Sequence, residues 1–553
     1  MIQIRRTSES PREGILLALA SEERVVGTLL HRAAERFGDR TFLQFGDACI
    51  GFGAFDDQAS QVGNGLIGRG LDRGGKVAIF MRNSLEFLQA WFGAARIGAL
   101  YVPINTDYKG EILRYQLDKA DVTHIIIGTE FVGRLAAVVA GLPELRHVII
   151  AGPWPETGLE DAVAALAGHV ALHDFAAVLD APAADPGIAV AHGDPHAISF
   201  TSGTTGPSKG VLATNGHVIS FARDWTRATA FREGEAIFTP LPLFHAIGAW
   251  LGVLPAMLMG GRIAIVPKFS ASTYWDEVRR YKADIAHGIF SMIPILLKQP
   301  ARPDDADQPA RAFYIGPQNV EFERRFNCRI VEVFGATENG IVTMSDYHGE
   351  RRPGSCGRPN TETFEVIIAD ENDEPVPPRR QGEILIRPRR PHSMMKEYYN
   401  APEATVEAFR NLWFHTGDNA WQDEDGYVYF LDRKKDAIRR RGENISSYEL
   451  EAVVNLHPAI LECAAVAVAS ELGEDEVKLV VVLRQGESLP AADLWAYCEE
   501  KMPRFWVPRF IEFRREMPKT ANQKIQKYVL RDRTPDSDLH DRGPAARARA
   551  AAR

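Results

Sequence analysis

The sequence predicts an α/β protein with a large N-terminal domain and a small C-terminal domain. The large domain should hold helix-covered sheets and a small β-barrel, and the small one should be mobile and α+β. Three observations predict this: alternating helical and strand patterns early, short β-like segments in the middle, and a compact α+β pattern near the end. A length of 553 residues also exceeds what one compact core supports.

The early part of the chain alternates between the two periodicities. Apolar residues recur at helical spacing, and between these stretches lie short apolar runs typical of buried strands. The helical stretches are 25–38, 51–70 and 84–99, and the strand-like runs are 76–81, 123–128, 147–152, 262–267 and 283–290. Strands separated by helices predict a largely parallel sheet covered by helices.

The pattern changes between about 355 and 430. Short β-like segments at 364–370, 382–388 and 426–432 are separated by Pro and Gly, which predicts a barrel-like β region. A charged run over 432–443 follows, and we place the hinge between the domains inside it.

The last part of the chain predicts a small domain. Its expected elements are a helix at 446–457, strands at 463–470 and 478–484, and a helix at 491–502. The predicted domains are therefore 1–434 and 435–533. The small, polar and Pro-containing tail over 534–553 predicts disorder.

Composition limits the function classes. The net charge of −9 does not indicate nucleic-acid binding, and no apolar run approaches the length of a membrane span. The five cysteines form no CxxC pair, so a reducing, cytoplasmic location is the simpler interpretation. The apolar run at 14–20 is at the lower length limit for a signal peptide. We expect a small-molecule partner, and the sequence permits a homo-oligomer.

Two common motifs occur in the wrong context. Gly63, Gly65 and Gly68 spell the dinucleotide-binding GxGxxG, but a helical pattern rather than a strand precedes them. Ser208 lies in a GxSxG, which makes a serine hydrolase a distant alternative. A nucleophile elbow must turn from a strand directly into a helix, whereas Pro207 and a strand-like run surround this serine.

The stretch 201–210, TSGTTGPSKG, is the most informative part of the sequence. Its glycines let backbone N–H groups turn toward an anion, its hydroxyl groups add donors, and Lys209 adds positive charge. The candidate phosphate-binding residues are Thr201, Ser202, Gly203, Thr204, Thr205, Gly206 and Lys209. The spacing is not that of a Walker A loop, and an ordinary hairpin loop is the alternative.

This stretch resembles the phosphate loop of the acyl-adenylate-forming (AMP-binding) superfamily. Further motifs that resemble those of the superfamily follow in order: FGATEN at 334–339, HTGD at 415–418, the run 432–451, and PKTANQKIQKYVLR at 518–531. The resemblance covers about 25–533, and 260–286 and 439–451 are most similar to the carnitine/crotonobetaine-CoA ligase-like branch. It implies an ATP-dependent acyl-CoA ligase that forms an acyl-AMP, then an acyl-CoA thioester, releasing AMP and pyrophosphate.

The resemblance implies catalytic roles for three residues. Lys524 would bridge the substrate carboxylate and the α-phosphate of ATP, although Gln523 stands where the family usually has Gly. Glu338 would bind Mg²⁺, with Thr337 beside it, because a hard cation prefers oxygen ligands. A solvated surface lysine is the alternative for Lys524.

Nucleotide contacts are implied for four more residues. Phe334, followed by Gly335, would stack on adenine, Asp418 would accept hydrogen bonds from the ribose, and Arg433 would reach the ribose or a phosphate. Without the family context, a turn residue and a solvated charge are the simpler interpretations of Asp418 and Arg433.

The remaining implied roles concern the acid and coenzyme A. His245 would lie near the acyl pocket, where amino-acid-activating relatives carry Asp, and this argues against an amino-acid substrate. Gly442 would let coenzyme A pass close to the backbone, and Lys435 would be the hinge. Residues 439–441 are either partners for coenzyme A phosphates or a solvated charge run. The alternative function is adenylation followed by transfer to a carrier protein.

Overall fold

The computed structural model describes the chain from Leu19 onward in several stretches. These are residues 19–153, 159–201, 208–290, 292–316, 318–433, 438–440, 443–445, 447–470, 474–518, 525, 527–531 and 538–543. The chain divides into two compact units. The large unit comprises 1–106, 114–200 and 210–432, and the small unit comprises 107–113, 201–209 and 433–553.

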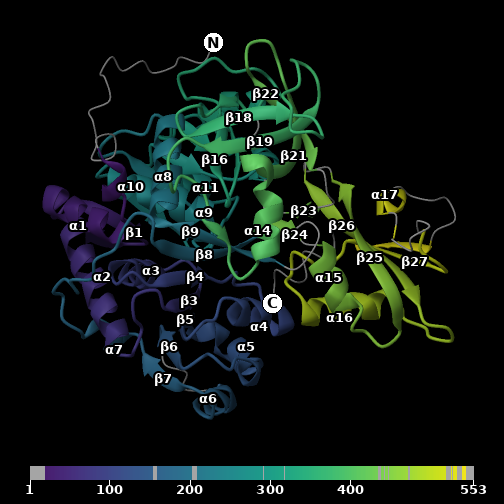
Figure 1. Cartoon of the computed structure of the whole chain (residues 1–553), viewed down its shortest axis with the longest axis horizontal. Coiled ribbons are helices and arrows are strands. Elements are labelled where there is room, and N and C mark those ends of the chain that lie inside the picture. Colours follow the sequence, from purple (N-terminus) through teal and green to yellow (C-terminus); the bar gives the residue numbers. More distant parts are fainter. Residues whose placement is uncertain are drawn as a thin grey trace. The chain divides into compact units, whose positions relative to one another are not determined.

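The large unit contains two large, mostly parallel sheets (Figure 1). In spatial order, the eight-stranded sheet consists of β20 (Glu397–Tyr398), β9 (Lys209–Thr214), β8 (Pro195–Thr201), β4 (Leu100–Pro103), β3 (Lys76–Phe80), β5 (His124–Gly128), β6 (His147–Ala151) and β7 (Ala171–Asp174). The seven-stranded sheet consists of β14 (Arg329–Val331), β13 (Ala312–Tyr314), β12 (Ile285–His287), β10 (Ala236–Thr239), β11 (Arg262–Ile265), β1 (Thr41–Phe45) and β2 (Ala48–Gly51).

Helices cover these sheets. They are α1 (Val26–Phe37), α2 (Phe52–Ile67), α3 (Leu85–Arg96), α4 (Gly110–Lys119), α5 (Val132–Ala136), α6 (Glu160–Ala167), α7 (Ala176–Leu179), α8 (Asn215–Ala228), α9 (Ala246–Gly248), α10 (Leu254–Leu258), α11 (Tyr274–Arg280), α12 (Met292–Leu297), α13 (Val320–Phe326) and α14 (Pro402–Ala408). Short 3₁₀ turns occur at Ser21–Glu23, Thr129–Phe131, Val139–Gly141 and Arg410–Leu412, and a π-helical segment, η4, spans Ala249–Val253.

One continuous core joins both large sheets. Apolar side chains of α1, α2, α3, α8 and α10 pack with Val77 and Ile79 of one sheet and with Ile237 and Ile263 of the other. Glycines allow the closest helix contacts. A Cβ on Gly93 of α3 would lie 2.4 Å from the Val62 side chain of α2. Of the GxGxxG glycines, Gly63 and Gly65 lie within α2 and Gly68 directly follows it, so they belong to a packed helix and its end rather than to a nucleotide loop, as the sequence predicts.

The β-rich region after the large sheets is also present. Its described strands form two sheets rather than one closed ladder. They are β15 (Val333–Ala336), β16 (Gly340–Met344) and β17 (Arg358–Pro359), and then β18 (Phe364–Ala369), β19 (Gly382–Pro388), β21 (Phe414–Gln422) and β22 (Val428–Arg433). Both sheets contribute to one core, with Val342, Phe364, Ile384 and Val428 among its members.

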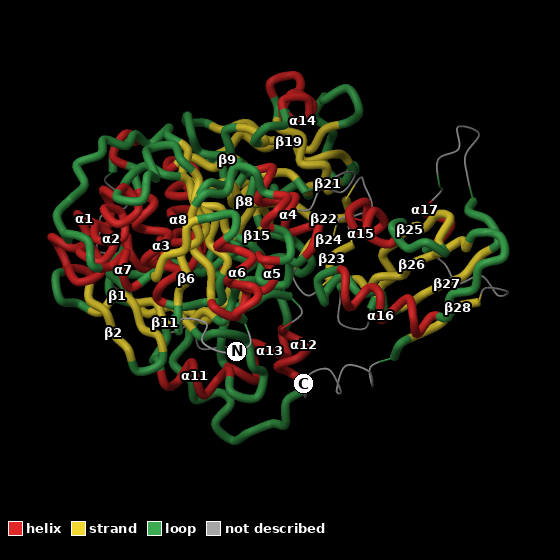
Figure 2. The backbone as a smooth tube through the Cα atoms, turned by 90° about the horizontal axis from the view of Figure 1, so that it is seen from below, coloured by secondary structure: helices red, strands yellow, loops and turns green. Residues whose placement is uncertain are grey.

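The small unit is α+β (Figure 2). Its four-stranded sheet contains β25 (Ile460–Ala469), β26 (Asp475–Leu483), β27 (Phe510–Arg514) and β28 (Asp538–Asp541), and a short ladder joins β23 (Ile438–Arg440) to β24 (Glu443–Ile445). Its helices are α15 (Ser447–Val454), α16 (Ala491–Lys501) and α17 (Lys527–Leu530). Leu479 and Val481 of β26 pack toward α15 and α16, whereas Val480 and Val482 pack with Leu530 of α17.

Part of the tail differs from the prediction. Residues 538–541 form β28 against β27 instead of being disordered. The His540 ring packs edge-on against Phe513 at 5.8 Å, and Arg509 pairs with Asp541 at 3.1 Å. The polar sequence of this segment has too few apolar residues to fold by itself, and these contacts with β27 and Arg509 provide the stabilisation instead. The remainder of 534–553, apart from 542 and 543, lies outside the described residues.

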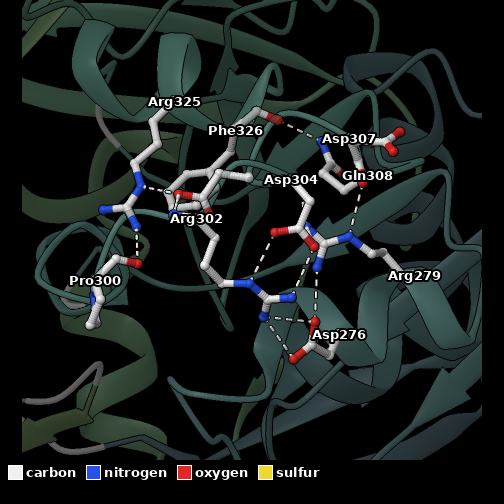
Figure 3. A network of polar contacts seen from close by, with 10 residues as sticks. Asp276, Arg279, Pro300, Arg302, Asp304, Asp307, Gln308, Arg325 and Phe326 are labelled. Carbon is white, nitrogen blue, oxygen red and sulfur yellow. Dashed lines mark hydrogen bonds and ion pairs between the residues drawn. The ribbon is translucent and has the colours of Figure 1, made fainter.

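An arginine network fixes the segment before β13 (Figure 3). Arg325 of α13 pairs with Asp305 at 2.7 Å and donates to the backbone carbonyl groups of Leu297, Gln299 and Pro300. Its side chain is 17% exposed. Arg302 pairs with Asp276 and Asp304 but is 45% exposed. The two arginines of this network therefore differ both in burial and in their hydrogen-bond partners.

We expect the Arg325→Met substitution to lower the free energy of unfolding by about 3 kcal/mol, because it leaves the Asp305 carboxylate and several carbonyl groups without a cation. Arg302→Met is the matched control and should leave the free energy of unfolding nearly unchanged, because solvent screens exposed ion pairs. Urea denaturation followed by circular dichroism measures both. Equal effects of the two substitutions would contradict this assignment.

Candidate active site

The ends of the glycine- and hydroxyl-rich loop are strand ends. Strand β8 ends at Thr201, β9 begins at Lys209, and the two strands are neighbours in the eight-stranded sheet. Five of the predicted phosphate-binding residues, Ser202, Gly203, Thr204, Thr205 and Gly206, lie outside the described residues. The chain after Ser208 enters a strand, so it does not make the strand-to-helix elbow that a serine hydrolase requires.

The FGATEN motif forms a tight hairpin between β15 and β16. The Ala336 N–H donates to the Asn339 side-chain oxygen at 2.8 Å, which closes the turn. A Cβ at Gly335 would lie 1.9 Å from the Gly340 carbonyl oxygen, so this position has no room for a side chain. The hairpin presents Phe334, Thr337 and Glu338, all of which are partly exposed.

Glu338 is connected through β20 to β9, the strand that follows the glycine-rich loop. The Tyr398 hydroxyl donates to the Glu338 carboxylate at 3.2 Å, and the Met395 N–H donates to the Glu338 backbone carbonyl at 2.8 Å. Tyr398 lies in β20, opposite Val211 of β9. Strand β20 therefore links the hairpin at 334–339 to β9 at one edge of the eight-stranded sheet, although the hairpin and β9 are distant in sequence.

Phe334 extends this arrangement toward the four-stranded sheet. Its ring stacks on Phe430 of β22 with centroids 5.6 Å apart and an interplanar angle of 29°. Strand β21, which carries the HTGD motif, is the neighbour of β22. The structure thus brings Phe334, Glu338 and the HTGD strand into one region of the large unit.

The HTGD motif lies at an irregularity in the ladder between β19 and β21. Gly417 has a φ of +75°, which favours glycine, and its N–H donates to the Glu383 carboxylate at 2.9 Å. The second Glu383 oxygen lies 3.2 Å from His415 Nδ1. Asp418 is 4% exposed and its N–H donates to Thr416 Oγ1 at 3.1 Å. Buried partners therefore set the backbone that presents Asp418.

His245 marks a second region of the large unit. It precedes α9, its backbone closes turns to Pro242 and Ala249, and its ring lies 4.8 Å from the Phe244 ring. The Asn83 side chain fixes the preceding loop by donating to the Leu241 carbonyl at 2.9 Å and accepting from the Leu243 N–H at 2.8 Å.

Two buried histidines lie in the core near these segments. His287 packs against the rings of Trp225 and Tyr314, and a Cβ on Gly252 of η4 would lie 3.5 Å from the His287 ring. His217 of α8 stacks in parallel with Phe221. None of the four ring nitrogens of His217 and His287 has a hydrogen-bond partner among the described residues. Burial lowers the pKa of each ring to about 3, so both are neutral at pH 7.

Several predicted residues cannot be placed. Lys524, Lys435 and Gly442 lie outside the described residues, as does the side chain of Arg433, whose backbone ends β22. Arg440 can be placed, and it is neither a solvated charge nor exposed toward a ligand. It is 6% exposed, pairs with Glu476 at 2.6 Å, and donates to the carbonyl groups of Phe505 and Val507.

Three supporting residues were missed by the sequence analysis: Tyr398, Glu383 and Asn83. The only signal for Glu383 was an acidic residue inside the otherwise apolar run 383–386, which is unusual for a buried strand. Tyr398 and Asn83 gave no signal, because their partners are distant in sequence.

Comparison with known proteins identifies the family. The family model for the AMP-binding enzyme matches residues 30–399, and the model for its C-terminal domain matches residues 449–524. The chain belongs to the AMP-binding enzyme family. The crotonobetaine/carnitine–CoA ligases of Salmonella paratyphi A and Salmonella enteritidis are 33% and 32% identical, over 90% of this chain and 97% and 96% of theirs, respectively.

Solved structures of AMP-binding enzymes have the same fold. An anthranilate CoA ligase in complex with anthranoyl-AMP aligns with a TM-score of 0.69 and 25% identity, covering 97% of this chain and 99% of that one. The o-succinylbenzoate CoA synthetase from Bacillus subtilis aligns with a TM-score of 0.78 and 21% identity over 93% of this chain and 99% of that one, and this likeness concerns the fold alone.

We expect His287→Phe to reduce the acid sensitivity of folding. The folded-state pKa of about 3 lies below the unfolded value of 6.5, so the unfolded chain binds a proton that the folded chain excludes. Stability is therefore fully present above pH 6.5 and falls between pH 6.5 and 3, by about 1.4 kcal/mol per pH unit for this ring. Urea denaturation measures the free energies of unfolding of wild type and variant. As the pH falls, wild type should lose more stability than the variant, so the difference between them should shrink or reverse in sign.

The control for this measurement is His169→Phe, at an exposed histidine after α6. The difference in free energy of unfolding between this variant and wild type should change little with pH. A pH-independent difference for His287→Phe would show that the ring is hydrated or charged in the folded protein.

Proposed function

We propose that this enzyme is an ATP-dependent acyl-CoA ligase. It would activate a carboxylic acid as an acyl-AMP, releasing pyrophosphate, and then transfer the acyl group to coenzyme A, releasing AMP. The observation that carries the proposal is the hydrogen bond between Tyr398 and Glu338. It joins the FGATEN hairpin to β20, and β20 pairs with β9, the strand that leaves the glycine-rich loop. Family membership and the adenylate-bound neighbour support the same reaction.

The described side chains Phe334 and Asp418 fit a nucleotide. The Phe334 ring lies against Phe430 and would present its other face to adenine, and the Asp418 carboxylate would accept from the ribose hydroxyls. Arg433 would act on the ribose or a phosphate. The residues of the loop, Thr201, Ser202, Gly203, Thr204, Thr205, Gly206 and Lys209, would donate to the phosphates, and Gly335 would keep the hairpin closed.

Glu338 and the adjacent Thr337 suit Mg²⁺. Among the residues that the structure describes, no cluster of three or more His, Cys, Asp or Glu side chains could hold a metal alone. Mg²⁺ is usually bound by one or two carboxylates together with substrate phosphates. We therefore propose that Glu338 binds the ion jointly with ATP, where the ion would neutralise phosphate charge.

Lys524 would supply the positive charge for the first step. A carboxylate oxygen attacks the α-phosphorus of ATP, the bond to the β-phosphate oxygen breaks, and pyrophosphate carries the electron pair away. Negative charge on the phosphoryl oxygens is then met by a fixed cation. In the second step the thiol sulfur of coenzyme A attacks the acyl carbonyl and AMP leaves.

One static arrangement cannot serve both steps, because Lys524 would contact the α-phosphate at the place that the thiol must later reach. We propose Lys435 as the pivot between two conformations, since a hinge is a few residues that absorb large φ/ψ changes. Gly442 would then let coenzyme A pass close to the backbone.

The acid is proposed to be small and to lack an essential α-amino group. His245 stands where amino-acid-activating relatives have a carboxylate, and the curated relatives are named for crotonobetaine and carnitine, neither of which is an α-amino acid. A reducing, cytoplasmic location is proposed from the five free cysteines. None of the helices that the structure describes has both the length and the apolar character to cross a bilayer. A homo-oligomer is also compatible with the proposal.

The proposed function is tested with the purified enzyme, ATP, Mg²⁺ and a panel of acids, with and without coenzyme A. The panel should include carnitine, crotonobetaine, benzoates, short fatty acids and α-amino acids. We expect AMP release that depends on a non-amino acid and yields a thioester only when coenzyme A is present. Release driven only by α-amino acids contradicts the substrate class, and transfer only to a carrier protein supports the alternative.

We expect Lys524→Ala to lower acyl-AMP formation about 100-fold or more, because it removes the cation at the α-phosphate. ATP binding, measured by calorimetry, should persist, and thioester formation from supplied acyl-AMP should fall far less. Lys519→Ala, in the same motif, serves as the control and should retain both half-reactions. Equal loss of both half-reactions in Lys524→Ala would refute the assigned role.

A further inference from the structure

The segment directly after Lys524 is held by contacts on one face of the small unit's sheet. Ile525 and Leu530 of this segment join a core with Val480 and Val482 of β26. The short helix α17 lies within it (Figure 1). Its four residues provide few local contacts, so its position depends on its tertiary partners.

The first partner is a buried ion pair beneath α17. Lys478 is 2% exposed and its Nζ lies 2.6 Å from the Glu512 carboxylate, which is fully buried. The same ammonium group donates to the Leu530 backbone carbonyl at 2.9 Å. Lys478 alternates along β26 with Leu479, so it faces the same side as Val480. A buried charge is costly unless all its hydrogen-bonding groups have partners. For Lys478, one of these partners is the Leu530 carbonyl group at the C-terminal end of α17.

The second partner holds the other end of the helix. The Lys527 ammonium group lies 2.6 Å from the Glu451 carboxylate and donates to the Ser447 hydroxyl at 2.8 Å, both on α15. Glu451 also accepts the Ala465 N–H of β25 at 2.7 Å. Lys527 is therefore fixed to a helix and, through Glu451, to a strand, although its sequence context alone suggests a solvated lysine.

We propose that Lys527 and Lys478 are positioning residues for the adenylation step. The proposal rests on the proposed function of Lys524, which precedes Lys527 by three residues, a span of at most about 11 Å. The two ion pairs fix both ends of α17. They therefore restrict the positions that the Lys524 side chain, three residues before the helix, can reach. Catalytic groups must be held within about 0.5 Å of their productive geometry, so loosening this anchor should affect the step that uses Lys524.

The test compares both half-reactions in Lys527→Met, which keeps the apolar stem but removes the charge. The kcat for acyl-AMP formation, measured by ATP–pyrophosphate exchange, should fall about 10- to 100-fold. A loss of this size is usual when a catalytic group is displaced slightly from its productive position. The KM for ATP and the rate of thioester formation from supplied acyl-AMP and coenzyme A should stay near wild type. Lys527→Arg should recover most of the exchange rate, because it restores the cation opposite Glu451.

Further variants exclude a purely structural effect. Glu451→Gln breaks the same pair from the other side and should give the same selective loss. The double substitution Lys478→Met with Glu512→Gln removes both charges of the buried pair, although it also takes the carboxylate away from Arg514, which is 17% exposed, and it should also slow exchange selectively. The control is Lys501→Met, at an exposed lysine of α16, which should change neither half-reaction.

The outcomes separate this inference from the proposed function. If no acid supports ATP–pyrophosphate exchange by the wild-type enzyme, the proposed function itself is overturned. If exchange survives Lys524→Ala, the role proposed for Lys524 is overturned, and this inference with it. Wild-type exchange that depends on Lys524 but survives both Lys527→Met and Glu451→Gln overturns the inference alone. Equal losses in the two half-reactions, with a matching loss of thermal stability, also overturn it, because they indicate a role in folding rather than in positioning.

Discussion

The hydrogen bond from Tyr398 to Glu338 is the interaction on which the candidate site depends. Through it the hairpin at 334–339 meets β20, and through the pairing of β20 with β9 it meets the strand that follows the glycine-rich loop. Stacking of Phe334 on Phe430 then brings in the sheet that carries Asp418. The edge strand β20, which has only two residues, links the hairpin to β9, and the Phe334–Phe430 stack links the hairpin to β22 and so to its neighbour β21.

An apolar core lies under this region, so its buried polar groups need hydrogen-bond partners within the protein. A polar group taken out of water is costly unless it is hydrogen-bonded. Glu383 illustrates the usual solution, since its two buried oxygens serve Gly417 and His415 at the irregularity before Asp418. His287 illustrates the exception: its ring has no hydrogen-bond partner among the described residues, and its low pKa keeps it neutral.

Charge in the small unit follows the same rule. Arg440 with Glu476 and Lys478 with Glu512 are buried pairs, and in each pair the cation also donates to a backbone carbonyl group. Neither cation is available as a surface charge, so a basic run in the sequence does not translate directly into a basic surface. Their role is to connect segments that have little apolar area of their own, such as α17.

The sequence by itself determined the alternating α/β pattern, the α+β end and the ordered motifs, because periodicity and turn chemistry are local properties. It therefore predicted the helices at 51–70 and 491–502 and the strands at 76–81 and 463–470 closely. Only the tertiary structure decided that Tyr398 holds Glu338, that Arg440 is buried and that residues 538–541 form a strand. Each of these depends on partners that are distant in the chain. Contacts between such partners produce no periodic pattern in the sequence, so they cannot be predicted from it.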